Sequence, residues 1–268
     1  MKKISYLILI LLLFNCKKET KEIIHEYNGQ LIKVELIDSI PNSFYSGFGG
    51  GIYENGSLKS LAYYQNGKIV DTLVYYHENG KIKEKGLVKN NMSIGWWLNF
   101  NEQGNLTAKT EYLHFGDSLY KNQVYYYDKK GNLKLEPSTF FKLNIPDTIK
   151  IGKNLARVEN YITNFNNNEL NLLTVIIENQ YSEFEFKKDT FSDGTLKPFF
   201  GIYGYKTGRQ KIKGKLEEKI VTSKDSSTMT ISHHYKYFEK EVYVWDKEKY
   251  SESGMRIRNE MEKEYKNN

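Results

Sequence analysis

The residue types that most often carry catalysis or bind metals are sparse in this chain of 268 residues. A zinc site needs three or four convergent ligands, and none of the histidines has a second ligand at such a spacing. No Gly-x-Ser-x-Gly motif occurs, and Cys16 is the only cysteine, so no serine or thiol nucleophile is indicated. The sequence therefore predicts a protein that is not an enzyme and holds no metal and no small-molecule cofactor. The histidines are His25, His77, His114, His233 and His234.

Two further patterns bear on chemistry. The Gly-Phe-Gly-Gly-Gly segment at residues 47–51 could be taken for a phosphate-binding loop, but that chemistry needs a helix N-terminus behind the glycines. Here a hairpin pattern follows at residues 52–56, so we interpret the segment as the entry into that hairpin.

Carboxylates are plentiful, and a glycosidase-like pair on facing strands would leave no trace in a single sequence. An envelope hydrolase with an unrecognised carboxylate site therefore stays an alternative.

The N-terminus has the organisation of a secretion signal. Lys2 and Lys3 precede a mostly apolar run at residues 4–14, and the charged stretch 17–22 follows directly. A membrane-spanning helix needs roughly 20 apolar residues, and this run has eleven. We expect residues 1–15 to be a signal peptide.

Cys16 is the residue expected to be chemically modified. A lone cysteine in a secreted chain makes no internal disulfide and needs another use. The sequence Leu-Phe-Asn-Cys at residues 13–16 resembles a lipobox, in the looser form of Bacteroidota lipoproteins, where signal peptidase II cuts before a diacylated cysteine. The resemblance implies a lipid on Cys16, a tether at residues 16–24, and anchoring to a membrane of the cell envelope, with the outer membrane favoured. Two acyl chains suffice for stable anchoring.

Composition argues against nucleic acid and for strands. The net charge is +6, but only four of the 39 cationic residues are arginines and the lysines are scattered among glutamates. We therefore expect no nucleic-acid partner. Three alanines against 22 tyrosines leave few strong helix formers and many residues that favour strands.

An internal repeat organises the first half. The glycines at positions 56, 80, 104 and 131 are separated by 24, 24 and 27 residues. In each repeat an aromatic residue comes first, and a polar turn that ends in the glycine follows it. An aliphatic residue stands two positions after the glycine. Second turns lie roughly midway, at Asn66-Gly67, Asn90-Asn91 and Gly116-Asp117. The pattern predicts an all-β fold in which tandem hairpins pair edge to edge into one sheet over residues 25–137.

These repeats resemble the bacterial MORN-like family. The resemblance covers residues 45–136 and is carried by the Tyr-x-x-Asn-Gly-x-Leu pattern and by one full copy of its tryptophan-bearing half, at residues 95–100. One repeat earlier, Thr72 stands in place of the tryptophan. Members of this kind are often catalogued as YwqK-type antitoxins, so the resemblance implies an immunity or antitoxin function as an alternative.

Alternation along the tryptophan-bearing strand separates its two faces. Trp96, Leu98 and Phe100 share one face and are expected to pack between hairpins, while Trp97 and Asn99 share the other. We expect Trp97 to contact an external partner, together with Asn99 and Tyr75. The alternative, that Trp97 packs under the following domain, is equally open.

The second half reads as a separate β-sandwich. The Glu-Pro-Ser segment at residues 136–138 interrupts the repeat, and short apolar or alternating runs follow. We expect a two-sheet sandwich over residues 138–250, with an immunoglobulin-like arrangement as one form of it, and a charged tail at 251–268. Strands are expected near 140–144, 155–163, 171–178, 182–187, 198–205, 210–221, 228–237 and 241–245, with hairpin turns at Asp193-Gly194 and Thr207-Gly208.

Four Asp-Ser/Thr-aliphatic triplets resemble the periplasmic O-glycosylation site of Bacteroidota. They would place a glycan on Ser39, Thr72, Ser118 or Thr148. The alternative is that these pairs are ordinary turn or strand-start residues.

Taken together, the sequence predicts a membrane-anchored envelope lipoprotein that acts as a binding module for a protein or glycan partner. A sheet of repeats offers a long, shallow face, which suits extended partners better than small molecules.

Overall fold

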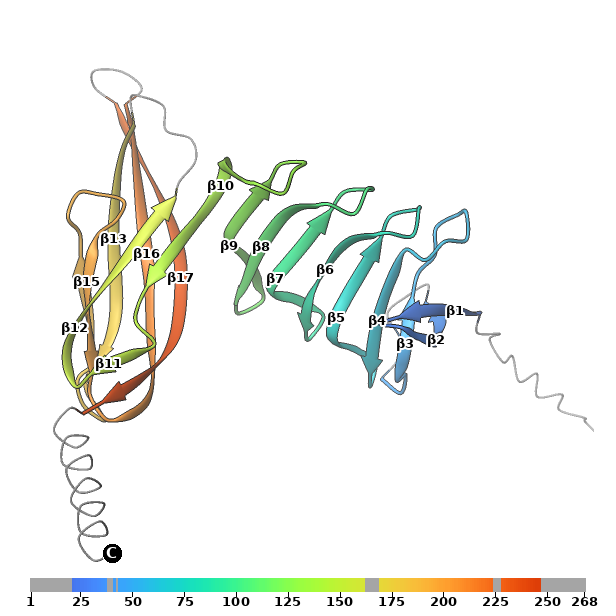
Figure 1. Cartoon of the computed structure of the whole chain (residues 1–268), viewed down its shortest axis with the longest axis horizontal. Coiled ribbons are helices and arrows are strands. Elements are labelled where there is room, and N and C mark those ends of the chain that lie inside the picture. The colour runs from blue at the N-terminus through green and yellow to red at the C-terminus, as the bar shows by residue number, and fades with distance from the viewer. Residues whose placement is uncertain (1–20, 38–40, 42, 162–168, 224–227, 247–268) are drawn as a thin grey trace, which may run out of the picture.

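The structure is a computed structural model that describes residues 21–37, 41, 43–161, 169–223 and 228–246. These residues form an all-β fold, as predicted, with no helix. In Figure 1 a row of hairpins leads along the long axis into a second, two-layered body at its C-terminal end. In the described part of the chain, no helix is long and apolar enough to cross a membrane.

The first body is a sheet whose strands pair in chain order, so the predicted tandem hairpins are confirmed. Neighbouring strands are antiparallel except β2 and β3, which are parallel. The strands are β1 (Glu22–Tyr27), β2 (Gln30–Leu36), β3 (Gly47–Gly50), β4 (Ser60–Gln65), β5 (Lys68–Tyr76), β6 (Ile82–Lys89), β7 (Met92–Phe100), β8 (Leu106–Phe115), β9 (Ser118–Tyr127) and β10 (Leu133–Asn144).

The four repeat turns share one set of backbone hydrogen bonds. In each, the N–H of the glycine donates to the carbonyl three residues earlier, at distances of 2.8–3.0 Å. The four glycines have φ values between 81° and 87°, a left-handed conformation that side chains disfavour. An Asn or Asp side chain in each turn accepts one or two further backbone N–H groups. The turn chemistry that the sequence repeats thus fixes the hairpins.

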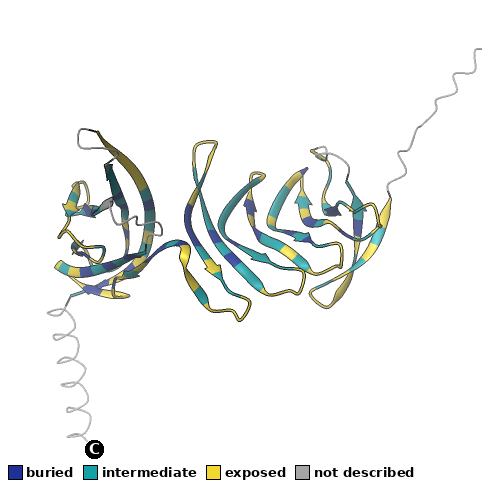
Figure 2. Ribbon diagram, turned by 90° about the horizontal axis from the view of Figure 1, so that it is seen from above, coloured by how far each residue is buried: buried dark blue, intermediate teal, exposed yellow. Residues whose placement is uncertain are grey.

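The strands carry β-bulges that recur with the same 24-residue period. Asp71 and Thr72 of β5 are extra residues that do not pair with β4. Gly95 and Trp96 of β7 are likewise extra residues that do not pair with β6. Asp71 and Gly95 have φ values of 72° and 62°. Bulges bend and twist strands, and the strands of this sheet curve visibly along their length (Figure 2).

The β1–β2 hairpin closes the N-terminal end of the sheet. Its residues Ile23, Tyr27 and Val34 belong to a hydrophobic cluster with Leu61 and Val74 of the first repeat. The first hairpin of the row therefore has an apolar core of its own.

The second body is a sandwich, as predicted. One layer, β10-β12-β15, continues the repeat sheet, and the other has the order β11-β17-β16-β13-β14. With β10, β12, β13, β15, β16 and β17 taken as strands A, B, C, E, F and G, the layers read A-B-E and G-F-C, an immunoglobulin-like order. The strands are β11 (Thr148–Lys150), β12 (Gly152–Tyr161), β13 (Glu169–Gln180), β14 (Phe186–Phe191), β15 (Phe199–Gly204), β16 (Gly208–Ser223) and β17 (Met229–Trp245).

Several predicted details of the sandwich were wrong. The expected strands 228–237 and 241–245 are one continuous strand, β17, because Met229 to Val244 pair with β16 in unbroken register. The expected strand 182–187 lies at 186–191 instead. The turns near Asp193 and Thr207 join strands of different layers, so neither closes a hairpin.

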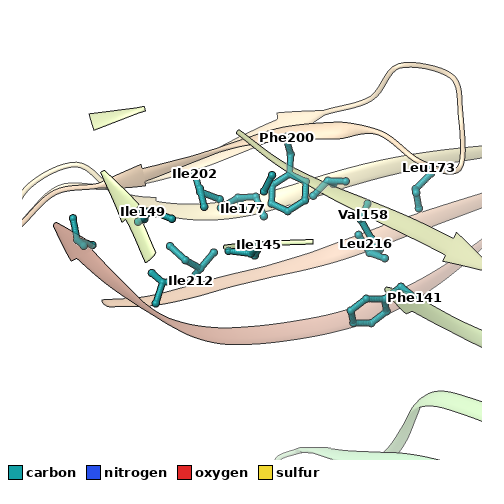
Figure 3. Close-up of a cluster of buried hydrophobic side chains, with 14 residues drawn as sticks. Phe141, Ile145, Ile149, Val158, Leu173, Ile177, Phe200, Ile202, Ile212 and Leu216 are labelled. Carbon is teal, nitrogen blue, oxygen red and sulfur yellow. The ribbon is translucent and has the colours of Figure 1, made fainter. Parts of the chain in front are cut away.

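The core of the sandwich lies between its layers (Figure 3). Val158 of one layer and Leu216 of the other are fully buried in it. Beside this apolar core, the Lys236 ammonium forms a buried ion pair with Glu218, and both groups bond to Asn160 of the facing layer. Burial lowers the pKa of Lys236, and the Glu218 carboxylate opposes that shift. This polar cluster links the two layers in a fold that has no disulfide.

β10 joins the two bodies. It pairs with β9 through Leu133, Lys134 and Thr139 and with β12 from Phe140 onward, with a register irregularity between Lys134 and Thr139. The predicted boundary at 137/138 thus falls inside one strand. The Phe140 ring stacks between the rings of Tyr125 and Tyr161, at centroid distances of 4.3 and 4.4 Å.

Candidate functional site

Two of the residues singled out for modification lie outside the described residues: Cys16 and Ser39. Ser118 is exposed at the start of β9, and Thr148 is exposed at the start of β11. Thr72 is half-buried and its hydroxyl donates to the Asp71 carboxylate at 3.2 Å. Glycosylation of these positions therefore stays a prediction.

Trp97 is not an external contact, and this expectation was wrong. Its side chain is only 3% exposed, and its indole N–H donates to the Leu87 carbonyl at 3.1 Å. The ring lies over Gly86 on the neighbouring strand and meets Tyr112 edge-on at 6.3 Å. It packs within the repeat sheet, so the alternative of packing under the sandwich does not hold either. The physical reason is that a glycine opposite Trp97 leaves room for the indole to lie flat on the backbone.

The predicted separation of faces along β7 is confirmed by the strand register. Trp97 and Asn99 pair with Thr110 and Ala108, whereas Trp96 and Leu98 pair with Glu111 and Lys109 on the other face. Trp96 lies on its own face beneath the Lys109 ammonium, which sits 4.1 Å from the ring centroid. Polar and aromatic side chains thus lie on both faces.

On the Trp97 face, strand pairing brings Tyr75 and Asn99 together with a carboxylate. Tyr75 pairs with Glu84, Glu84 with Asn99, Asn99 with Ala108, and Ala108 with Tyr126. Because directly paired residues point to the same side of a sheet, these side chains form one row across β5 to β9.

Tyr64 and Tyr112 extend the row into a band. Tyr64 is two residues after Ala62, and Tyr112 is two residues after Thr110, so both side chains lie on the same face as those residues. They form a second row, which is separated from the first by the row that contains Trp97. Between the two rows the floor holds the small residues Ala62 and Gly86 along with the buried Trp97 indole. We call this surface the tyrosine band; it consists of Tyr64, Tyr75, Glu84, Asn99, Tyr112 and Tyr126.

Electrostatic coupling indicates that these side chains lean toward one another. Burial raises the pKa of Tyr75, and the Glu84 carboxylate raises it further. The pKa of Tyr112 is raised by burial, then by Glu84 and by the neighbouring Tyr126. Burial and the nearby Tyr75 raise the pKa of Tyr64. These three hydroxyls are therefore protonated at neutral pH and can donate as well as accept hydrogen bonds.

Among the residues that the structure describes, the polar groups of the tyrosine band differ from those of the repeat turns in having no hydrogen-bond partner. In the turns, Tyr53 donates to the Tyr76 carbonyl, His77 to the Phe100 carbonyl and Asn79 to the Glu102 carbonyl, which joins each turn to the next. Within the described part of the chain, neither the Glu84 carboxylate, nor the Asn99 amide, nor any tyrosine hydroxyl of the band makes a hydrogen bond to another residue.

The histidines have structural surroundings rather than a shared site. His25, His77 and His114 each lie against Tyr76, Phe100 or Ser93 of a neighbouring strand or turn, and His233 pairs with Glu217 on the exposed face of the sandwich. Among the residues described, no group of three or more His, Cys, Asp or Glu side chains could hold a metal ion.

One small cavity lies near the N-terminal hairpin. It has a volume of about 230 Å³ and is lined by Tyr27, Phe48, Leu61, Ala62, Tyr63, Val70, Asp71 and Thr72. Its apolar walls come from the cluster that closes the sheet, so it belongs to the packing of that end.

Tyr75 and Asn99 were found from the sequence, whereas Tyr64, Glu84, Tyr112 and Tyr126 were missed. A signal existed in the repeat itself. Tyr75 and Asn99 both lie five residues before a repeat glycine, and so does Tyr126. Glu84 and Ala108 both lie four residues after one. Pairing these two classes of position requires the hairpin register, which the structure supplies.

Chemically, the tyrosine band offers neutral donors and acceptors around one carboxylate. Glycosidic hydrolysis uses two carboxyl groups about 5–10 Å apart, and the band as defined has only Glu84. The arrangement is suited to recognition of a ligand by hydrogen bonds and ring contacts.

Comparison with family models, with curated proteins and with solved structures finds no match for this chain. Its function is therefore inferred from its own residues and their geometry.

Proposed function

We propose that this protein is a lipid-anchored lipoprotein of the bacterial cell envelope and acts as a non-enzymatic binding module for a protein or glycan partner. Its contact surface is the tyrosine band of a MORN-like hairpin sheet. The lipid on Cys16 and the tether at residues 16–24 hold this sheet at the membrane.

One observation carries the proposal. The polar groups of the tyrosine band are accessible and lack partners within the described chain, while nearby polar side chains of the turns are used to hold the sheet together. Tyrosine is common in recognition surfaces because it combines a flat apolar ring with a polar tip. The band has one side chain on each of six consecutive strands, β4 to β9, and four of the six are tyrosines, which suits an extended partner.

The sandwich supports the proposal by holding the sheet in a fixed position. Asn122 of β9 is only 2% exposed and forms two hydrogen bonds with the backbone of Tyr237 in β17, at 2.8 and 2.7 Å. The Glu111 carboxylate accepts from the same Asn122 amide at 2.6 Å. These contacts hold the band in one orientation relative to the sandwich.

Crosslinked purification from native cells tests this function. The full lipoprotein serves as bait, beside a Cys16→Ala strain and a strain carrying Tyr75→Ala with Glu84→Gln. We expect envelope components to be enriched only with Cys16 present, and to be lost from the band variant while its membrane association persists. Membrane attachment of the Cys16→Ala protein would contradict the anchor.

The identity of the recovered partner separates the alternatives. Recovery of one stoichiometric toxin-like protein, whose binding is lost when any surface of the chain is mutated, would support an immunity function in place of the proposal. Turnover of an envelope glycan by the purified protein would replace it with hydrolysis. Partner recovery unaffected by the band variant would show that the contact surface lies elsewhere.

A further inference from the structure

A buried cluster of three side chains between the layers of the sandwich has the composition of a reactive site. Lys236 of β17 supplies an amine, Asn160 of β12 supplies an amide, and Glu218 of β16 supplies a carboxylate. Each of these residues is only 3% exposed. An amine, an amide and a proton carrier that are held together away from water are the groups that the exchange of one amide bond for another requires.

The distances place the amine against the amide. The Lys236 ammonium donates to Oδ1 of Asn160 at 2.9 Å and contacts Oε1 of Glu218. Because a C=O bond is about 1.2 Å long, Nζ of Lys236 lies no farther than about 4 Å from Cγ of Asn160, the atom that a nucleophile attacks. Reacting atoms in a near-attack geometry are about 3–3.5 Å apart, so little movement is needed.

Glu218 contacts both nitrogens that would exchange protons in such a reaction. Its Oε1 accepts from Nζ of Lys236 and also from Nδ2 of Asn160, the second at 2.7 Å. One carboxylate oxygen thus bridges the attacking nitrogen and the leaving nitrogen. This is the position required of a group that moves protons from one nitrogen to the other.

The surroundings of the cluster favour an uncharged amine. The fully buried Leu216 pairs with Lys236, and the fully buried Leu173 pairs with Glu218, whose other neighbour, His234, is exposed. Burial lowers the pKa of Lys236, and the Glu218 carboxylate opposes that shift. Transfer of a proton from the ammonium to the carboxylate removes both buried charges, and it gives the amine the free electron pair that attack requires.

From this geometry we infer that Lys236 and Asn160 join in an intramolecular isopeptide bond, with Glu218 as the proton carrier. Nζ of Lys236 forms a bond to Cγ of Asn160, and the bond between Cγ and Nδ2 breaks. Glu218 carries two protons in turn from Nζ to Nδ2 and ends as a carboxylate. An ammonium ion leaves, and the new amide keeps one hydrogen on its nitrogen. The balance requires no oxidant and no second substrate.

The bond ties one layer of the sandwich to the other across 76 positions of the chain. In antibody domains of this architecture a disulfide links the two layers, whereas Cys16 is the only cysteine of this chain. A covalent link between distant positions stabilises a fold largely by restricting the unfolded chain. An amide link does the same and is not cut by reducing agents. This role concerns the stability of the sandwich and is independent of the tyrosine band.

Peptide mapping of the protein purified from native cells tests the bond. Without the bond, trypsin releases residues 158–187 and residues 225–236 as separate peptides. With it, cleavage after Lys236 is blocked, and residues 158–187 are recovered joined to residues 225–240, at a mass one ammonia below the sum of the two peptides. The joined peptides are the decisive readout, because an asparagine that only cyclises also loses ammonia. On a reducing, denaturing gel the joined chain is expected to migrate faster, since its closed loop keeps it compact.

Variants assign the role of each group. Lys236→Met and Asn160→Ala each lack one of the joined atoms and are expected to give separate peptides. Glu218→Gln carries no proton between the nitrogens and is expected to slow bond formation about 10²–10⁴-fold, so that freshly made protein is largely unjoined. Lys240→Met is the matched control: Lys240 lies on the same face of β17, but its ammonium donates to the Ile145 carbonyl at 2.7 Å. Joined peptides are expected from it in full yield.

Two results would overturn the inference. Separate peptides from the folded protein of natural sequence show that no bond forms, whatever the variants do. Joined peptides from Glu218→Gln at the natural rate, in a variant that circular dichroism shows to be folded, remove the proton-carrying role of Glu218. Neither result bears on the tyrosine band, whose partner recovery is a separate measurement.

Discussion

The indole of Trp97 lies directly on the backbone of Gly86 in the adjacent strand. A Cβ atom at Gly86 would fall 2.3 Å from Cγ of the Trp97 ring, far inside any van der Waals contact. The two residues are paired across β6 and β7, so the absence of a side chain at Gly86 makes room for the indole of Trp97. This relationship explains why the largest side chain on this face is also one of the most buried.

Changes to this pair should therefore lower stability. Gly86→Ala is expected to reduce the free energy of unfolding by about 1–3 kcal/mol, through forced displacement of the ring. Trp97→Ala is expected to cost about 3–5 kcal/mol because it leaves a cavity in the sheet. Chemical denaturation measures both, with Leu87→Ala at an exposed neighbouring position as the control. A near-neutral Trp97→Ala would contradict its buried placement.

Asn122 should couple the unfolding of the two bodies. Its amide completes two hydrogen bonds to the Tyr237 backbone and one to Glu111, so Asn122→Ala leaves buried groups unpaired. We expect a loss of about 1–3 kcal/mol and separation of one thermal transition into two. Calorimetry and small-angle scattering would report the loosened junction. An unchanged scattering profile and a single transition would mean that β10 alone fixes the arrangement.

Where Lys236 has not joined to Asn160, the buried ion pair of the sandwich should behave as a unit. Lys236→Met leaves the Glu218 carboxylate buried without its cation, and the expected cost is about 3–5 kcal/mol. Combining it with Glu218→Leu should recover most of that loss, because both charges are then absent. Denaturant titrations of the single and double variants decide the matter. Additive losses would show that the two side chains contribute independently.

Alkaline pH should destabilise the fold through its buried tyrosines. Burial raises the pKa of Tyr45, Tyr76 and Tyr125 to about 12 each, with smaller contributions from neighbouring acids and tyrosines. A raised folded pKa gives stability that is fully present below the unfolded value of about 10 and is lost as pH rises toward 12. The free energy of unfolding is therefore expected to fall across this window.

Tyr76→Phe isolates one of these groups, since lysines also titrate at high pH. The variant should show a shallower fall between pH 10 and about 12 than the unmodified protein. Equal slopes would indicate that Tyr76 ionises alike in the folded and unfolded chains.

The amino-acid sequence alone determined the hairpin row. Its turns depend on local chemistry: glycine in a left-handed conformation and an Asn or Asp side chain that accepts nearby N–H groups. Such features act within a few residues and so are legible in the chain. Alternation along β7 likewise gave the correct division of Trp97 and Asn99 from Trp96 and Leu98, because side chains in a strand point alternately to its two faces.

Only the tertiary structure decided which of those faces receives a large side chain and which residues meet across strands. The burial of Trp97 depends on Gly86, and Glu84 joins Tyr75 and Asn99 only through the register of β5, β6 and β7. An irregularity between Tyr75 and Tyr76 shifts the register of β5 against β6, and the bulge at Gly95 shifts that of β6 against β7. Pairing between strands is set by long-range packing and by such shifts, whereas local propensity sets only the turns. For the same reason β17 continues through positions that seemed to end a strand: its pairing with β16 outweighs the local pattern.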